Sequence, residues 1–372
     1  MQQIPIKIAI FANENQNLLN LITMKKLLFM LTVVLFACQA ANAQRSFSVY
    51  AVGFYNLENL FDTEHDEGKD DHEYLPDGGN KWNELKYSHK LHNLATVLSE
   101  LGTDKLPNIG CAFIGVAEVE NARCLADLCN EPELKSRNFQ FCHIEGPDKR
   151  GVDCGLLYNP SLFQVRDTKL VPYVYEEEKD TAKLTRGFLT VSGTLAGEHV
   201  TAVVCHLPSR FRGSYYRELG ARQIKALKDS LLADDPQCKV FVMGDMNDDP
   251  INKSMYEVLG AKEEVELVGE DDMYNPWYNT LVKQHTGTLK YDGKWNLFDQ
   301  IILSPNLLNT NKVKDYSTLK FWKNEIFRRD YLFQTTGRYK GNPKRTHAGG
   351  VWLDGYSDHL PVCVYLVKEK IQ

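Results

Sequence analysis

The sequence predicts one α/β domain built on two packed β-sheets, and three observations support that prediction. Patterns typical of strands and of helices alternate along the chain from Arg45 onward. Most of these segments are strand-like, and no Pro- or Gly-rich linker divides the chain. Many strands with interspersed helices favour a single domain in which two sheets pack against each other.

The predicted elements follow from the spacing of apolar residues. Leu91, Leu94 and Leu98 indicate a helix after Trp82, and Gly102 suits its end. A second helix is predicted over residues 214–233. The predicted strands cover residues 46–55, 109–117, 139–144, 152–158, 162–170, 188–195, 200–206, 239–244, 297–303 and 362–367. A hairpin turn is expected at residues 196–199, and surface loops at 68–79 and 324–350.

The first part of the chain is expected to be a leader and not part of the fold. Residues 1–43 are predicted to be a leader and signal peptide, and residues 45–370 to be the folded domain. Met24 is the better start, because it precedes two lysines and then an apolar run at residues 27–36. That run is too short for a membrane-spanning helix.

Small residues before a cleavage site favour removal of this leader. Ala41 and Ala43 occupy the positions that signal peptidase requires, so cleavage is expected after Ala43. We therefore expect an exported protein, periplasmic or secreted, with no transmembrane segment after removal. Cys38 offers a second possibility, acylation as a lipoprotein. Oligomeric state is not indicated.

Charge and cysteine content exclude several classes of site. The net charge is −6, and removal of residues 1–43, with three lysines and one glutamate, makes it −8. An acidic chain has no general attraction for nucleic acid, so a phosphate-bearing substrate needs local contacts. The chain lacks a CxxC pair, which argues against zinc. Apolar runs hold or adjoin four cysteines that are expected to be core residues: Cys111, Cys154, Cys205 and Cys238.

Acidic, amide and imidazole side chains gather at the ends of the predicted strands. Side chains at rigid strand ends can be directed toward one point. Asp299 is different because it lies within an apolar run, where an unpartnered charge is costly. His359 is its expected partner, since a carboxylate on one ring nitrogen favours the imidazolium. The candidate site residues are Asn56, Glu118, His206, Asp245, Asn247, Asp299, Asp358 and His359.

These residue types favour metal-assisted chemistry on phosphate. Carboxylate and amide oxygens suit Mg²⁺, with Mn²⁺ as a second choice. A metal beside phosphate offsets the charge that develops during attack by water, and a histidine can act on the same charge or on a proton. The rival class is a serine hydrolase, but no G-x-S-x-G sequence is present.

Several motifs resemble those of the endonuclease/exonuclease/phosphatase superfamily, over nearly the whole predicted domain. Residues 115–120 read GVAEVE, residues 244–248 read GDMND, and residues 356–361 read YSDHLP. The resemblance implies a four-layer α/β sandwich, in which two mixed sheets pack face to face between helices. It also implies a metal-dependent hydrolase of phosphoester bonds. A non-catalytic module that binds phosphate ligands on the same fold is the alternative.

The resemblance also implies a role for each candidate residue. Glu118 corresponds to the principal metal ligand, with Asn56 close to it and Asp358 on the metal side. Asp245 and Asn247 correspond to the pair that orients water and phosphate. His359 corresponds to the catalytic histidine, supported by Asp299, and His206 to the second histidine of the DNase I-like branch.

The substrate is left open at the level of its class. Nucleic acid, a nucleotide, an inositol phosphate and a phospholipid headgroup all fit a phosphoesterase. Arg186 and Arg210 could each contact phosphate or pair with a structural acid. Arg345, with Thr346 and His347, could bind substrate phosphate or form a solvated basic patch.

Overall fold

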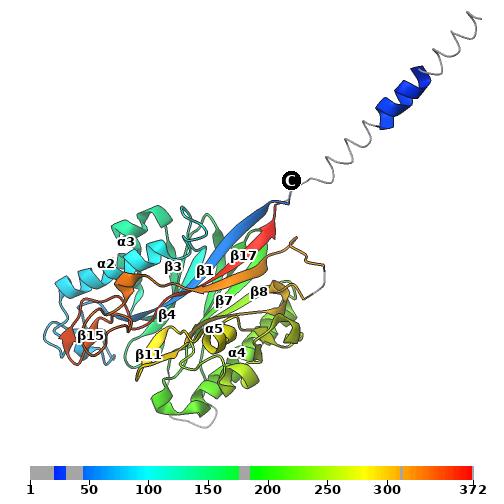
Figure 1. Cartoon of the computed structure of the whole chain (residues 1–372). Helices are drawn as coiled ribbons and strands as arrows, with labels where there is room; N and C mark the ends of the chain where they lie inside the picture. Colours follow the sequence, from blue (N-terminus) through cyan, green and yellow to red (C-terminus); the bar gives the residue numbers. More distant parts are fainter. Residues whose placement is uncertain (1–20, 31–44, 176–184, 311–312, 371–372) are drawn as a thin grey trace, which may run out of the picture. The chain divides into compact units, whose positions relative to one another are not determined.

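The computed structural model describes residues 21–30, 45–175, 185–310 and 313–370 (Figure 1). The chain separates into two units, Met1–Phe47 with Lys370–Gln372 and Ser48–Glu369. Residues 21–30 are helical. The rest of the predicted leader, including Cys38 and Ala43, lies outside the described residues. Over the described ranges, no helix has the length and apolar character needed to cross a membrane.

Two mixed β-sheets form the larger unit, in the strand orders β14-β17-β1-β2-β4-β3 and β5-β6-β7-β8-β13-β10-β9. β1 and β2 are parallel, as are β7 and β8, whereas β4 and β13 run antiparallel to their neighbours β2 and β8. The first sheet contains β1 (Phe47–Leu60), β2 (Phe113–Val119), β3 (Gln140–His143), β4 (Asp153–Tyr158), β14 (Lys320–Ile326) and β17 (Val362–Glu369). The second contains β5 (Phe163–Val171), β6 (Phe188–Leu195), β7 (Glu198–His206), β8 (Lys239–Asp245), β9 (Ala261–Lys262), β10 (Met273–Tyr274) and β13 (Asp299–Leu303).

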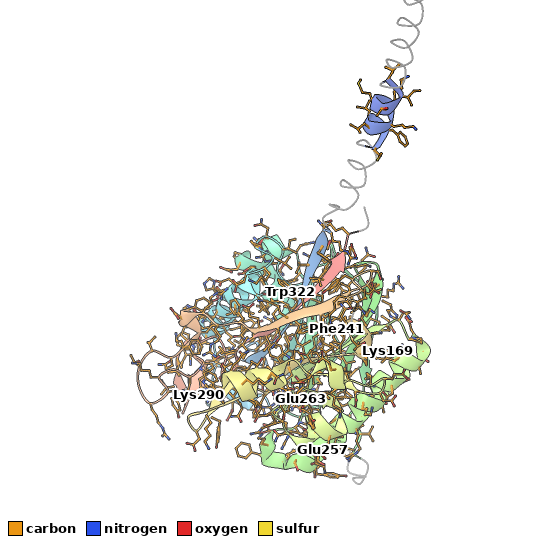
Figure 2. All side chains as sticks on the ribbon, turned by 45° about the vertical axis from the view of Figure 1, so that its right-hand side comes forward. Lys169, Phe241, Glu257, Glu263, Lys290 and Trp322 are labelled. Carbon is orange, nitrogen blue, oxygen red and sulfur yellow. The ribbon has the colours of Figure 1, made fainter. Side chains whose placement is uncertain are left out.

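Alternating side chains along the strands divide the apolar interior into three layers. In β8, Phe241 and Met243 face the other sheet, whereas Val240 and Val242 face helix α4 (Ser214–Asp234). Phe241 is fully buried among packed side chains, while Lys169 lies at the surface (Figure 2).

Helices cover the outer face of each sheet. α2 (Glu84–Glu100) and α3 (Ala122–Asn130) pack their apolar residues on the first sheet, and α4 packs on the second (Figure 1). The predicted four-layer sandwich is therefore confirmed. α5 (Trp277–Gln284) buries Trp277 against the layer between the sheets. The shorter segments are η1 (His72–Tyr74), β11 (Leu289–Tyr291), β12 (Lys294–Asn296), β15 (His347–Ala348) and β16 (Val351–Trp352), with further single helical turns between the strands.

Most predicted strands are present, with boundaries that shift by a few residues, and the four cysteines named above are buried as expected. The prediction of a surface loop over residues 324–350 was wrong at both ends of that range. β14 continues to Ile326 and pairs with β17, while β15 and β16 form a hairpin. β14 is an edge strand with half-buried residues, so its sequence lacks the apolar run of a central strand.

Candidate active site

The predicted strand-end residues do come together. Asn56 and Glu118 lie on the parallel strands β1 and β2, and His206 and Asp245 end the parallel strands β7 and β8. Asp299 begins β13 directly opposite Asp245. Parallel strands end at one edge of a sheet, and the two sheets place these edges together.

An irregularity between β1 and β2 presents Glu118. Asn56 pairs with Ala117 and Leu60 with Val119, so three residues of β1 stand opposite Glu118 alone. Glu118, Glu58 and Asn59 all have positive φ angles, of 63°, 49° and 51°. The Asn59 amide donates to Glu118 Oε2 at 2.9 Å. Each such conformation costs on the order of 1–3 kcal/mol, and three of them at one strand irregularity support this position as a candidate site.

Two carboxylates face each other across the sheets. Asn56 Nδ2 donates to Asp245 Oδ2 at 3.1 Å and lies 3.4 Å from Glu118 Oε1. His206 Nε2 lies 3.6 Å from Asp245 Oδ2 and 3.7 Å from Glu118 Oε1. Burial raises the pKa of the Asp245 carboxyl to about 7, and the Asp299 and Glu118 charges act in the same direction. Two negative groups this close favour a cation between or beside them.

His359 has the partner expected from the sequence. Its Nδ1 lies 2.7 Å from Asp299 Oδ2, and Asp299 is fully buried. Its Nε2 lies 3.8 Å from Asp245 Oδ2 and 3.9 Å from Asp358 Oδ1. Burial opposes protonation of this ring, but the carboxylates of Asp299, Asp245 and Asp358 outweigh it and raise the pKa well above its ordinary value.

The two histidines of the site differ in charge. Burial lowers the pKa of His206 well below its ordinary value, and the nearby Arg186, Arg150 and His359 charges lower it further. Burial thus favours the neutral form of His206, and its buried Nδ1 has no hydrogen-bond partner among the described residues. Neighbouring groups whose pKa values are driven apart are typical of acid–base sites.

The candidate arginines are held by acids. Buried Arg186 donates to Asp148 at 2.8 Å and to the His206 carbonyl at 3.2 Å. Of the two roles expected for it, phosphate contact or pairing with a structural acid, the structure shows the second. Arg210 donates to Asp249 at 3.0 Å and stacks over Phe298.

Arg345 and Asn247 each contact an acid that belongs to the cluster. Arg345 pairs with Asp358 and lies 3.6 Å from Glu58, beside the acidic cluster. The Asn247 backbone amide donates to Asp245 Oδ1 at 2.9 Å, while its side chain donates to the Leu207 carbonyl. Asn247 therefore helps to fix the Asp245 carboxylate.

A polar cavity of about 270 Å³ adjoins the cluster at Glu58 and Asp358. Arg345, Tyr74 and Asn80 also line it. The sequence pointed to Arg345 but not to Tyr74 or Asn80, because both lie in a segment expected only to be a surface loop or its border.

Lys90 was also missed, although its position carried a signal. It lies on the buried face of α2 between Tyr87 and Leu94, where a lysine is unusual. Its Nζ donates to Thr346 Oγ1 at 2.6 Å and to the Tyr356 carbonyl at 2.7 Å. Lys90 thus holds one wall of the cavity.

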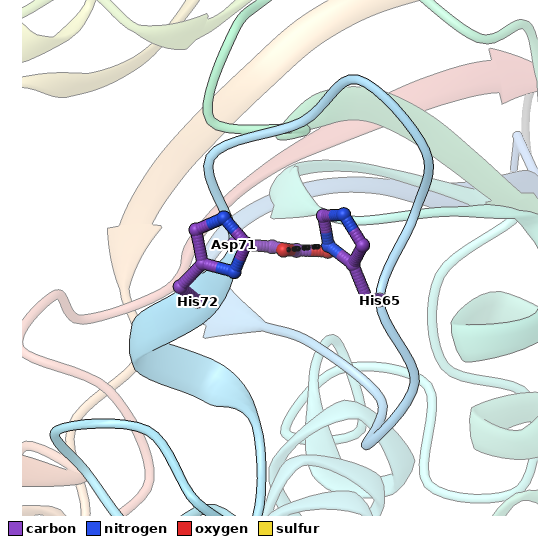
Figure 3. A group of neighbouring side chains, drawn as sticks. All are labelled: His65, Asp71 and His72. Carbon is purple, nitrogen blue, oxygen red and sulfur yellow. Dashed lines mark hydrogen bonds and ion pairs between the residues drawn. The ribbon is translucent and has the colours of Figure 1, made fainter.

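A second imidazole–carboxylate group lies on the loop that leads to Tyr74. Figure 3 shows Asp71 between His65 and His72, and Asp71 Oδ1 lies 2.5 Å from His65 Nδ1. Asp71 Oδ2 accepts from the Asp66 amide at 2.8 Å. Asp71 is buried and therefore stabilises this loop from within.

Comparison with known proteins agrees with this geometry. A sequence model described as the endonuclease/exonuclease/phosphatase family matches residues 51–368. The chain belongs to this family. The family groups nucleases and phosphatases, so the chain is assigned to hydrolases that act on phosphoester bonds. A search of curated proteins found no match.

Solved structures share the fold at low sequence identity. A family member from Bacteroides thetaiotaomicron is 14% identical, with a TM-score of 0.53 over 87% of this chain and 97% of its own. A mannosyl-6-phosphatase from the same organism is 13% identical, with a TM-score of 0.52 over 85% and 99%. A humanized D. rerio TDP2 is 13% identical, with a TM-score of 0.51 over 86% and 98%.

Proposed function

We propose that this protein is a Mg²⁺-dependent phosphoesterase that hydrolyses a phosphate ester with water. The observation that carries the proposal is the position of His359. Its ring lies between buried Asp299 and Asp245, at one edge of a cluster that also contains Glu118 and Asn56. This cluster combines the positively charged ring of His359, carboxylates and the amide donor of Asn56 around one point.

The donor set fits a hard divalent cation. Glu118 would be the principal ligand, because the β1–β2 irregularity presents it and its carboxylate lies near that of Asp245. Asp358 is the neighbouring carboxylate donor. Asn56, expected from the sequence as a ligand, directs its Nδ2 toward Glu118 and Asp245 while its Oδ1 accepts from the Glu58 amide at 2.9 Å, so it holds the ligand carboxylates in place. These ligand types suit Mg²⁺, and Mn²⁺ would be accepted. When bound, the cation supplies charge neutralisation at the phosphate.

The protein side chains then divide the remaining work. His359, held as an imidazolium by Asp299, stabilises negative charge on the phosphoryl oxygens. Asp245 is the candidate base that takes a proton from the attacking water, because its buried carboxylate lies at the centre of the cluster, 3.8 Å from His359 Nε2. Asn247 fixes Asp245 through its backbone amide, and Asn56 donates to the same carboxylate. His206 adds a neutral imidazole beside both acids.

Removal of the metal tests this proposal. We expect hydrolysis of a simple phosphate ester to stop in excess EDTA and to return with Mg²⁺. Glu118→Gln should keep the size of the side chain but weaken the response to Mg²⁺, because it removes the anionic ligand. Glu266→Gln, at an exposed position, is the matched control. Hydrolysis that continues unchanged after exhaustive chelation would rule out the metal, and a complete lack of turnover would favour a non-catalytic binding module.

We also propose export of the protein, on the basis of the leader at residues 1–43. Intact mass of the protein recovered from its host should correspond to a chain that begins at Gln44. A retained apolar segment at residues 27–36, or a diacylated Cys38, would contradict cleavage after Ala43.

A further inference from the structure

The cavity beside the catalytic cluster has a lining without apolar side chains. Every side chain on its wall carries a polar or charged group, and the rest of the wall is glycine. One wall comes from η1 and the residues after it, and the other from the β15–β16 hairpin. Asp358 belongs both to this cavity and to the cluster, because its Oδ1 lies 3.9 Å from His359 Nε2, and Glu58 lines the cavity. The cavity therefore adjoins the cluster where we place the phosphate, so it can receive the alcohol part of the same substrate.

Several of these polar groups have no protein partner. Among the described residues, the buried Nε2 of His347 has no hydrogen-bond partner. The side chains of Glu73, Tyr74 and Asn80 also make no hydrogen bond to the described protein, but Glu73 is exposed and the other two are half-buried. Because buried polar atoms normally have partners, the Nε2 of His347 needs an explanation. The other three groups are open to solvent or to a ligand. Together these groups provide both donors and acceptors on the wall of one cavity.

The walls are nevertheless held in place. The Tyr74 ring stacks on Phe61, with centroids 4.2 Å apart and an interplanar angle of 6°. On the other side, Glu58 Oε2 accepts from the amide and the hydroxyl of Thr346, and Lys90 donates to the same hydroxyl. The unpartnered groups are thus presented by fixed elements, as a binding site requires.

Charge and size restrict what can bind. Glu58, Glu73 and Asp358 bring three carboxylates to the wall, whereas Arg345 is its only lysine or arginine and already pairs with Asp358. A second phosphate would meet repulsion from Glu73, which disfavours a nucleic acid strand. An alkyl chain would leave the polar groups unpaired. The volume is also below the roughly 300–1,000 Å³ of pockets for drug-sized ligands.

We propose that this cavity binds a compact, neutral, hydroxyl-rich ring, so that the substrate is the phosphate ester of a sugar or a cyclitol. Hydroxyl groups both donate and accept, and they match the Tyr74 hydroxyl, the Asn80 amide and the His347 ring. The proposal rests on the phosphoesterase function stated above, because it assigns the alcohol part of the same substrate.

Kinetics with matched esters test the proposal. In Mg²⁺, glucose 6-phosphate and myo-inositol 1-phosphate should each be compared with butyl phosphate and with a single-stranded oligonucleotide. We expect kcat/KM for at least one polyol ester to exceed that for butyl phosphate by about tenfold or more. The better of the two polyol esters distinguishes a sugar from a cyclitol substrate.

Variants assign the preference to the cavity. Tyr74→Phe keeps the stacked ring and removes only the hydroxyl, and Asn80→Ala removes the amide. Each should lower kcat/KM for the polyol ester by about threefold to tenfold, the effect of one lost hydrogen bond, and leave butyl phosphate unchanged. Tyr291→Phe, at an exposed tyrosine, should change neither value. Equal losses on both esters, or equal turnover of butyl phosphate and polyol esters by the unmodified protein, would overturn the proposal.

The two proposals fail in different ways. Preferred hydrolysis of the oligonucleotide would keep the phosphoesterase function and reject the polyol cavity. If no ester is hydrolysed, titration calorimetry with the same polyol esters decides the cavity alone. Binding that Tyr74→Phe weakens would support it, and no binding would reject it.

Discussion

Two histidine–aspartate pairs in this protein have the same nitrogen–oxygen distance and different surroundings. His359 Nδ1 lies 2.7 Å from Asp299, and His199 Nδ1 lies 2.7 Å from Asp235. The first pair is buried at the meeting point of two sheets, whereas the second is more than one-third exposed beside the β6–β7 turn. Distance alone therefore does not distinguish the pair that we propose to be catalytic. Burial and the further carboxylates around His359 make the difference.

The largest effect is expected from His359→Ala. This change removes the cation that faces the phosphate, so kcat/KM should fall on the order of 10²-fold or more. Phosphate release in saturating Mg²⁺ is the measurement, and circular dichroism checks the fold. Activity within a few-fold of the unmodified protein would remove His359 from the mechanism.

Asp299→Asn should cause the next largest loss of kcat/KM. An amide keeps the volume of the side chain but no longer favours the imidazolium, so a loss on the order of 10²-fold is expected. Since the two residues form one unit, the double variant with His359→Ala should be little worse than His359→Ala alone. Losses that multiply in the double variant would mean that the two side chains act separately.

The smallest effect belongs to the exposed pair. His199→Ala should leave kcat/KM unchanged and lower the free energy of unfolding by no more than about 1 kcal/mol, because solvent screens such pairs. Urea denaturation together with the same phosphate assay measures both quantities. A large loss of activity in this variant would show that removal of any such pair disturbs the site. The loss in His359→Ala would then not assign a special role to His359.

The sequence predicted the fold and the central cluster because both depend on local patterns. Apolar runs define the strands, and polar residues at their ends become neighbours once the strands are parallel, as with Asn56 and Glu118. Asp299 could be paired with His359 because a buried charge requires a partner. These inferences need only the order of elements and the cost of burial.

The cavity could not be predicted in the same way. Tyr74 and Asn80 lie on a polar segment without periodicity, and the β15–β16 hairpin opposite them is more than 250 residues away in the chain. Only tertiary contacts, such as Lys90 to Thr346, bring the two walls together. The irregularity at Glu118 could not be predicted either. The positive φ of this glutamate results from the way β1 and β2 pair, and the local sequence does not indicate it.

The strand order of the first sheet has a consequence for how the protein is made. β1 lies between β2 and β17, and β17 begins about 300 residues after β1. During synthesis the amino-terminal end of the chain emerges first. One edge of β1 therefore stays unpaired until β17 has been synthesised. His359 directly precedes β17, and the centre is therefore completed only after nearly the whole domain has left the ribosome. If His359 acts as proposed, chains that end before it would be inactive.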